Sequence, residues 1–294
     1  MHPEIKAICF PVTKEATVEL FKDATMEVNS ENAYAIVGRI GKRKKALNFC
    51  SDVYKLVENS AVLEPLMPVL EKKFKGFETR VKSTKDAQFF VNVTPTIPTV
   101  SPKSEIILPA VSFVNSYDGK IKAQAIGGLV RYMVDEKGRV SVTFSTYLKG
   151  LSFVYEFKHS NSAIYSMEEV STHIDNYITN FETVENQINL MKAVTIEKPT
   201  SAKIEKLIRN LVKGTHFPLK SIDETIQRIE YEMDVFECDL NLWILYNSMN
   251  FILENCEADL SQKLRMEADN KIYANILQLF DKKLTKETET VEAA

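Results

Sequence analysis

Residues 106–134 read IILPAVSFVNSYDGKIKAQAIGGLVRYMV, and they decide the fold because two apolar runs flank the polar turn Asn115-Ser116-Tyr117-Asp118-Gly119. Both runs are rich in residues that favour strands, and Asp-Gly supplies the positive φ that closes a β-hairpin. Asn and Asp also suit a turn that hydrogen-bonds its own backbone. This stretch therefore predicts a hairpin at the centre of a sheet. Within it, Gly127-Gly128 predicts a β-bulge, since no G-x-G-x-x-G pattern surrounds the pair.

Strand patterns continue on both sides of this hairpin. Residues 87–93 form an apolar run before it, and residues 140–145 alternate apolar and polar side chains after it. Residues 151–157 repeat the pattern, whereas the prolines in 95–102 exclude a regular element there. We predict an antiparallel meander of four or five strands.

The N-terminal part combines short strand patterns with a helical excursion. Residues 4–37 indicate small pieces of sheet, and the glycine-punctuated stretch 38–45 predicts an exposed loop. From Leu47 onward, apolar residues recur at helical spacing to Val57, and a second helical stretch ends near Phe74. We therefore expect a helical insert over residues 47–75.

The chain beyond residue 160 has the spacing of helices. Ser166 and Ser221 are candidate N-caps, the first for a helix reaching about residue 193. Apolar residues from Ile222 to Trp243 follow alternating gaps of four and three, a heptad pattern that favours internal core over an intermolecular coiled coil. Two amides, Asn247 and Asn250, interrupt the next apolar face, and we expect them to fix their helix against the sheet.

These patterns predict an α+β fold in which an antiparallel meander carries an N-terminal helical excursion and a C-terminal helical region packs on the sheet. The predicted domains are a mixed sheet domain over 1–160 with its insert at 47–75, and a helical region over 161–281 packed on the sheet. A polar tail over 282–294 follows.

Composition excludes several classes of protein. The chain has 294 residues, 45% hydrophobic and 26% charged, which is ordinary for a globular protein. Its four scattered cysteines form no C-x-x-C, so we expect free thiols in an intracellular protein. Neither a signal peptide nor an apolar run long enough to span a membrane is evident, so we expect no membrane association.

Charge is unevenly distributed although the net charge is only −3. Residues 36–85 hold 12 Lys and Arg against 5 Asp and Glu, a net of +7. Residues 221–294 hold 7 against 16, a net of −9. Such polarity can present a basic surface to a polyanion or draw copies together, and we expect a homo-oligomer.

A basic run is the best candidate for a functional surface, because Lys and Arg beside glycines can follow a phosphate backbone. Phe74 and Phe77 lie among the later basic residues, where they could stack on bases. The alternative is a run that only solvates a loop. Gly38, Gly41 and Lys42 do not have the G-x-x-x-x-G-K-[ST] spacing of a phosphate-binding P-loop. The predicted nucleic-acid-binding residues are Arg39, Lys42, Arg43, Lys44, Lys45, Lys72, Lys73, Lys75, Arg80 and Lys82, with Lys85 nearby.

No arrangement of residues predicts catalysis, so we expect no enzyme, no cofactor and no metal site. His159 and His173 flank a strand-to-helix junction without cysteines nearby, which favours ordinary hydrogen-bonded or exposed histidines. Asp234, Glu237 and Asp239 fall beside the heptad stripe and are interpreted as a solvated flank.

The order of several motifs over about residues 30–255 resembles the phage/plasmid-like protein family, a domain of unknown function. Members carry an N-S-x-D-G turn, an arginine followed by cysteine and asparagine, a His-Thr pair, and a late helix with an Asn-Ala motif. The matching positions are Asn115 to Gly119, Arg131, His159-Ser160 and Asn247-Ser248. This chain departs from the family after Arg131, where Tyr132-Met133 replaces Cys-Asn, and at Ser160, which replaces threonine.

The resemblance implies a protein from a phage or other mobile element, acting in the cytoplasm of an infected bacterial host or in the virion. Together with the basic run, it leads us to expect a non-enzymatic nucleic-acid-binding protein, active in single-stranded DNA binding or annealing. The comparison with single-strand annealing proteins is by analogy of fold. The alternative is a structural or interaction protein, a virion component or host-factor binder, that acts through its helical region.

Overall fold

The computed structural model describes residues 2–17, 33–97, 101–145, 148, 152–157, 163–196, 199–255 and 260–292, with the backbone alone at 163–167 and 282–292. The chain divides into two compact units. Unit 1 comprises Met1–Thr96, Val111–Gly127 and Phe153–Ile178, and unit 2 comprises Ile97–Ala110, Gly128–Ser152 and Thr179–Ala294. The boundary predicted at residue 160 follows the type of secondary structure, whereas these units follow packing, so that division stays a prediction.

Unit 1 is built on strands and two main helices. It contains α1 (Pro3–Ile8), β1 (Val12–Ala16), β2 (Tyr34–Ile40), β3 (Arg43–Cys50), α3 (Asn59–Phe74), β4 (Phe77–Thr84), β5 (Gln88–Pro95), β9 (Val154–Glu156) and most of α4 (Ala163–Thr179). β6 (Ser104–Ser116) and β7 (Gln124–Val134) contribute residues to both units.

Unit 2 is mainly helical. It contains β8 (Val140–Ser145), α5 (Glu182–Ala193), α6 (Ser201–Leu211), the 3-10 turn η2 (Leu219–Ser221), α7 (Ile222–Phe236), α8 (Leu242–Asn255) and α9 (Gln262–Glu292). α9 continues along the backbone through most of the segment predicted as a polar tail. No helix among the described residues has the length and apolar character needed to cross a membrane.

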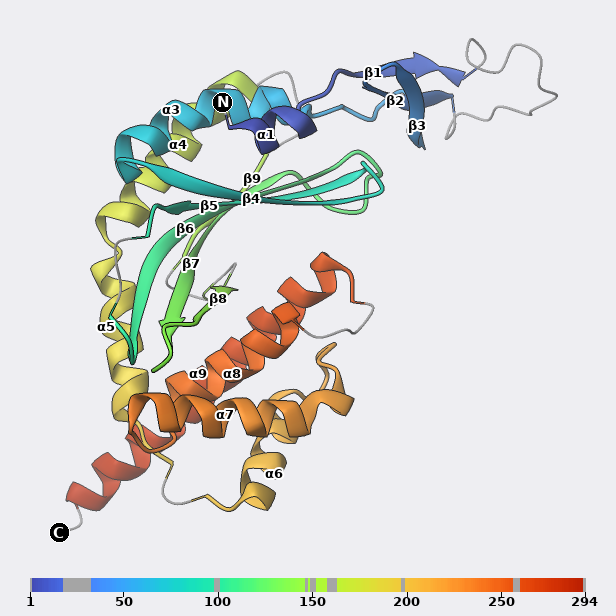
Figure 1. The fold of residues 1–294 in the computed structure, drawn as a ribbon. Coiled ribbons are helices and arrows are strands. Elements are labelled where there is room, and N and C mark those ends of the chain that lie inside the picture. The colour runs from blue at the N-terminus through green and yellow to red at the C-terminus, as the bar shows by residue number, and fades with distance from the viewer. Residues whose placement is uncertain are drawn as a thin grey trace. The chain divides into compact units, whose positions relative to one another are not determined.

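The strands in the described part of the chain form two sheets, and together with the helices they confirm the predicted α+β fold. A three-stranded sheet has the order β1-β2-β3, and the larger sheet has the order β4-β5-β6-β7-β8, with β9 paired to β7 (Figure 1). The strand pairs whose register is described are antiparallel. The predicted meander is confirmed as far as β8, because consecutive strands are neighbours along the path from β4 to β8. Its last predicted strand, within residues 151–157, departs from the prediction, because β9 pairs with β7 and not with β8.

The turn that links β6 to β7 has the predicted chemistry. Gly119 has a φ of 71°, and the Asn115 and Asp118 side chains accept hydrogen bonds from backbone N–H groups one and two residues ahead, at 2.8 and 3.1 Å. The same turn also holds α3. Asn115 Nδ2 donates to Asn59 Oδ1 at 2.9 Å, and the Asn59 N–H donates to the Tyr117 hydroxyl at 3.0 Å. The turn thus fixes the start of a helix as well as reversing the chain.

The core of unit 1 lies between α3 and the larger sheet. Leu66 and Leu70 of α3 are fully buried in one apolar cluster with Phe89 and Val91 of β5 and Phe113 of β6. The α3 helix coincides with the predicted stretch that ends near Phe74. Its burial follows from apolar residues three and four positions apart on one helix face.

The predicted helix from Leu47 to Val57 is wrong. Residues 47–50 belong to β3, and the register between β2 and β3 shifts at Ile36/Val37. Such a bulge lets Leu47 and Cys50, three residues apart, both turn toward the core, which imitates helical spacing in the sequence. The small pieces of sheet expected over residues 4–37 are likewise wrong at their start, because Pro3–Ile8 is the helix α1, which begins at Pro3, a favourable first helical residue.

Two further helix predictions need correction. The helix expected from Ser166 to about residue 193 starts earlier and is two helices, α4 and α5, separated at Asn180-Phe181. The heptad segment is interrupted after Phe236, where Glu237 takes the left-handed conformation with a φ of 50°. Ser221 occupies the N-cap position as predicted, because α7 begins at Ile222, but its side chain makes no capping hydrogen bond.

The helices α7 and α8 form the core of unit 2. Ile222 and Ile229 of α7 are buried, which confirms that the heptad stripe serves internal packing. In α8, Asn250 Nδ2 donates to the Phe144 carbonyl at 3.0 Å and to Ser145 Oγ at 2.9 Å, so this amide fixes the helix to β8 as expected. Asn247 Nδ2 instead donates to a carbonyl of its own helix, that of Trp243.

Candidate functional site

The predicted basic loop is a β-hairpin. β2 and β3 are joined at Gly41-Lys42, where Gly41 has a φ of 61°, and Arg39 lies directly opposite Lys44. All five basic side chains predicted between residues 39 and 45 are exposed. We call these five residues, Arg39, Lys42, Arg43, Lys44 and Lys45, the basic hairpin. Like charges opposite each other on a strand pair repel, so this arrangement does not stabilise the hairpin.

Two of the five cations have acidic partners. Lys44 Nζ lies 3.3 Å from Glu15 of β1, and Lys45 Nζ lies 2.9 Å from Asp86. The Thr13 hydroxyl and, after it, Lys44 hold the pKa of Glu15 below its ordinary value. Both pairs are exposed and therefore contribute little to stability, but they orient two lysines toward the protein.

The other three cations form the hairpin tip, which comprises Arg39, Lys42 and Arg43. Within the described part of the chain, none of the three has an acidic side chain at ion-pair distance. Arg39 still helps to lower the pKa of Glu15 from beyond ion-pair distance, and solvent ions compensate the rest of this positive charge. Release of such ions is what drives a basic surface onto a phosphate backbone.

The structure divides the remaining predicted basic residues into two groups. Lys45 Nζ also donates to the Lys85 carbonyl at 2.9 Å, so the turn after β4 lies beside the basic hairpin. Arg80 and Lys82 precede this turn on β4, and both are exposed.

The lysines of α3 lie at the opposite end of β4. Lys72, Lys73 and Lys75 come before Phe77, the first residue of the strand. Eight strand residues at about 3.3 Å each separate the ends of β4 by roughly 26 Å. Lys73 also forms an ion pair with Asp175 of α4. These lysines are therefore not part of the surface around the hairpin tip.

The aromatic residues expected to stack on bases are misplaced. Phe74 is buried in the core of unit 1, and Phe77 packs against the same cluster. The prediction for Phe74 is wrong because that residue faces inward from the last turn of α3. Phe49, on the same strand as Lys44 and Lys45, is 40% exposed and was missed. The mistaken helix at 47–57 concealed it, since only a strand places Phe49 next to the basic run.

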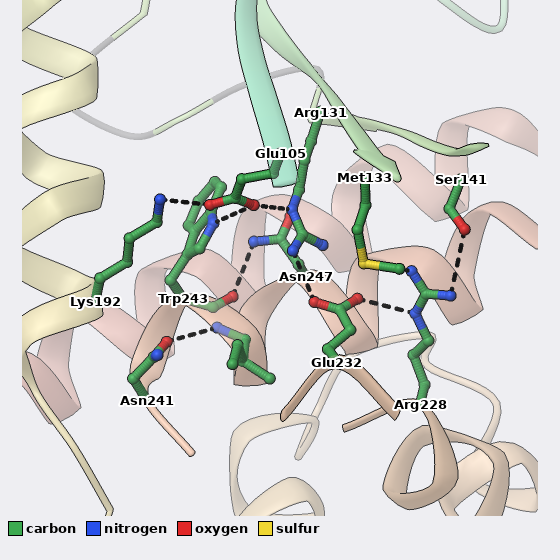
Figure 2. Close-up of polar contacts among 11 residues, drawn as sticks. Glu105, Arg131, Met133, Ser141, Lys192, Arg228, Glu232, Asn241, Trp243 and Asn247 are labelled. Carbon is green, nitrogen blue, oxygen red and sulfur yellow. Dashed lines mark hydrogen bonds and ion pairs between the residues drawn. The ribbon is translucent and has the colours of Figure 1, made fainter. Parts of the chain in front are cut away.

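A second arrangement, the ionic cluster, lies in unit 2 and comprises Glu105, Arg131, Lys192, Arg228 and Glu232. Arg131 is only 1% exposed and lies between two carboxylates (Figure 2). Its Nε donates to Glu105 Oε2 at 2.5 Å, and its Nη2 lies 2.8 Å from Glu232 Oε2. Glu105 also pairs with Lys192, and Arg228 Nε donates to Glu232 Oε1 at 2.9 Å.

Aromatic side chains complete the ionic cluster. Trp243 Nε1 donates to Glu105 Oε2 at 3.3 Å, and the Arg228 guanidinium lies 3.9 Å from the centre of the Phe251 ring. Burial opposes charge on Glu105, but Arg131 and Lys192 more than offset it, and the pKa of Glu105 lies below its ordinary value. Glu105 is therefore ionised at neutral pH, and three cations face two carboxylates.

Sequence reasoning found only Arg131 of this cluster, through the family motif. Glu232 carried a signal in the spacing Ile229-Glu232-Val235, which places its carboxylate on the buried face of α7. The sequence around Glu105 and Lys192 gives no signal of their role, because their partners are remote in sequence.

The remaining sequence candidates have ordinary surroundings. His173 stacks on Phe153 with ring centres 5.8 Å apart, in keeping with a structural histidine, and His159 lies outside the described residues. Asp234, Glu237 and Asp239 are exposed, as expected of a solvated flank. No group of His, Cys, Asp and Glu in the described ranges is arranged to hold a metal ion.

Comparison with known proteins gives a family but no characterised relative. No curated protein and no solved structure matches the chain. Residues 46–250 match the model of one protein family, the domain of unknown function DUF932. The match includes α3, the strands of the larger sheet, the ionic cluster and most of α8. It covers well over half of the chain, which therefore belongs to the DUF932 family.

Proposed function

We propose that this protein is a non-enzymatic, phage-encoded protein that binds single-stranded nucleic acid through the basic hairpin. The observation that carries the proposal is the hairpin tip, where Arg39, Lys42 and Arg43 are exposed and, among the described residues, have no acidic side chain at ion-pair distance. A basic hairpin of this kind can follow a phosphate backbone without reading base edges.

The other residues of the basic hairpin have a supporting role in this proposal. Lys44 and Lys45 form ion pairs with Glu15 and Asp86, which hold the hairpin in place. Either lysine must give up its ion pair before it can bind a phosphate. Phe49 offers an exposed ring on the same strand, on which a base can stack. A single strand supports both contacts because its bases are accessible.

The phage origin rests on the resemblance of the turn and late-helix motifs to phage/plasmid-like proteins. Annealing of complementary strands is the activity that best suits a binding protein without catalytic groups. The uneven charge, net +7 over residues 36–85 and net −9 over residues 221–294, supports self-association. Light scattering in low and high salt tests that part: an assembly that dissociates as salt rises is expected, and a monomer at every salt concentration contradicts it.

Fluorescence anisotropy with labelled oligonucleotides tests binding itself. We expect the wild-type protein to bind single-stranded DNA at low salt, and the variant Arg39→Ala/Lys42→Ala/Arg43→Ala to bind at least tenfold more weakly. The matched control is Lys203→Ala/Lys206→Ala/Lys213→Ala, which removes three exposed cations of unit 2 and is expected to bind like wild type. Equal losses in both variants, or no binding at low salt, would refute the proposal.

A further inference from the structure

The ionic cluster borders a cavity of about 420 Å³ that lies within unit 2. Cavities of this size suit small organic molecules. Its charged lining residues are Lys103, Glu105, Arg131 and Lys192, and Phe236, Trp243 and Ile244 supply apolar walls. The cavity thus combines ionised groups with the partly exposed ring of Phe236, while Trp243 and Ile244 are almost fully covered.

Positive charge is in excess among the residues that line the cavity, although Arg131 and Lys103 are also paired with Glu232 and Glu237 outside the lining. Three of the four charged lining residues are cations, and the carboxylate of Glu105 already accepts from Arg131, Lys192 and Trp243. An ammonium has three N–H donors. Glu105 takes one donor of Lys192 and Glu237 takes one of Lys103, which leaves donors for an anion in the cavity.

The cluster is costly as a purely structural device. Four of the five charged groups are almost fully removed from water, whereas the Lys192 side chain stays 36% exposed. Burying those four is offset only by good geometry, and apolar residues of similar size often stabilise a protein as well or better. Clusters of ionisable groups at a cavity are frequent at binding sites. Here the buried Arg131 fixes Glu105, and Glu105 in turn orients Lys192 and the Trp243 ring (Figure 2).

We propose that this cavity binds a small organic anion with a planar ring, whose charged group contacts Lys103 and Lys192 and whose ring packs against Phe236, beside the almost fully covered ring of Trp243. This site is separate from the basic hairpin, since every lining residue belongs to unit 2. Nucleoside monophosphates and aromatic carboxylates share the required chemistry.

Trp243 is the only tryptophan of the chain, so intrinsic fluorescence reports directly on this cavity. Four kinds of probe separate the contributions of ring and charge: the ribonucleoside 5′-monophosphates, benzoate, inorganic phosphate alone and benzyl alcohol. We expect saturable quenching or a spectral shift with a monophosphate or with benzoate, and at least tenfold weaker effects with phosphate or benzyl alcohol. Whichever binds more tightly, a monophosphate or benzoate, shows whether the natural anion is a phosphate or a carboxylate. No saturable response to either at 5 mM would overturn the proposal.

Variants locate the anion. Lys103→Met/Lys192→Met removes both ammonium groups, and we expect the affinity measured by calorimetry to fall about tenfold or more, the effect of losing a charged hydrogen bond. Lys213→Met/Lys220→Met removes two exposed lysines outside the cavity lining and is expected to leave affinity unchanged. Unaltered affinity in the first variant would refute the assignment.

Oligonucleotide binding provides an independent readout. The cavity variant is expected to bind single-stranded DNA as wild type does, because the basic hairpin is intact. The hairpin-tip variant is expected to bind the small anion normally. Failure of either proposal would therefore leave the other standing.

Discussion

Arg131 Nη2 lies 2.8 Å from Glu232 Oε2, and neither side chain is more than 1% exposed. Each charge would be costly to bury alone, so the two residues, together with Glu105 and Arg228, are stable only as a set. This relationship links β7 to α7 within unit 2 and places a permanently charged group beside the cavity.

Removing Arg131 should strongly destabilise the protein. Arg131→Met leaves Glu105 and Glu232 without their shared cation, and we expect the free energy of unfolding to fall by about 3–5 kcal/mol. Urea denaturation measures the change. Arg209→Met removes an arginine from an exposed pair with Glu205 and should cost less than about 1 kcal/mol. Similar decreases for the two variants would show that Arg131 is not specially placed.

The amide of Asn250 should stabilise the packing of α8 on β8. Asn250→Ala leaves the Phe144 carbonyl and the Ser145 hydroxyl without this donor, and we expect a decrease of about 1–3 kcal/mol in the free energy of unfolding. Asn255→Ala, at the exposed end of the same helix, is the control and should change it by less than about 0.5 kcal/mol. A neutral Asn250→Ala variant would contradict the assigned role.

The sequence predicts the elements whose signals are local. The Asp118-Gly119 turn, the strands beside it and helix α3 follow from turn chemistry and from spacing within a few residues. The hairpin that carries Arg39 to Lys45 was expected to be a loop and then a helix, because the bulge in β3 places apolar residues three apart. This segment is a strand because it pairs with β2, and such pairing cannot be inferred from the spacing of apolar residues alone.

The candidate sites were less predictable than the fold. The exposed basic run was evident from composition, whereas the pairing of Lys44 and Lys45 with acids from β1 and the β4 turn depends on residues distant in sequence. The ionic cluster joins residues from β6, β7, α5 and α7. The spacing in α7 places Glu232 on a buried face, but a single sequence does not show that these residues meet.

A close approach to Gly127 should make this position intolerant of a side chain. A Cβ there would lie 2.8 Å from Phe153 Cδ1 and 3.1 Å from Tyr177 Cδ1. We expect Gly127→Ala to lower the free energy of unfolding by about 1–3 kcal/mol. The double variant Gly127→Ala/Phe153→Leu should recover part of this stability relative to Phe153→Leu alone. If Gly127→Ala lowers the free energy of unfolding as much in the Phe153→Leu background as in wild type, the cause lies in the backbone and not in the contact with Phe153.

Stability should depend on pH through Glu105. Its pKa in the folded protein is below the ordinary value, since Arg131 and Lys192 outweigh the opposing effect of burial. The stabilisation is therefore fully present above the unfolded value of about 4.3 and is lost as the pH falls through the lower folded value. Glu105→Gln should be less stable than wild type at pH 7, and the difference should narrow below about pH 4.3.

The difference in stability between wild type and Glu105→Gln is measured from their urea unfolding midpoints at pH 7, 5, 4 and 3.5. Glu224→Gln, on an exposed position of α7, is expected to parallel wild type throughout. A difference between wild type and Glu105→Gln that stays constant across this range would contradict the role of the ionised Glu105.

The salt dependence of single-strand binding tests the central claim most directly. Each phosphate that the protein neutralises on a single strand adds about 0.7 to the steepness of log K against log salt, so replacing Arg39, Lys42 and Arg43 should reduce the steepness by about 2. We predict a shallower slope for the hairpin-tip variant and an unchanged slope for the unit 2 lysine control. Parallel lines for wild type and the hairpin-tip variant would contradict the claim that these three residues bind phosphates.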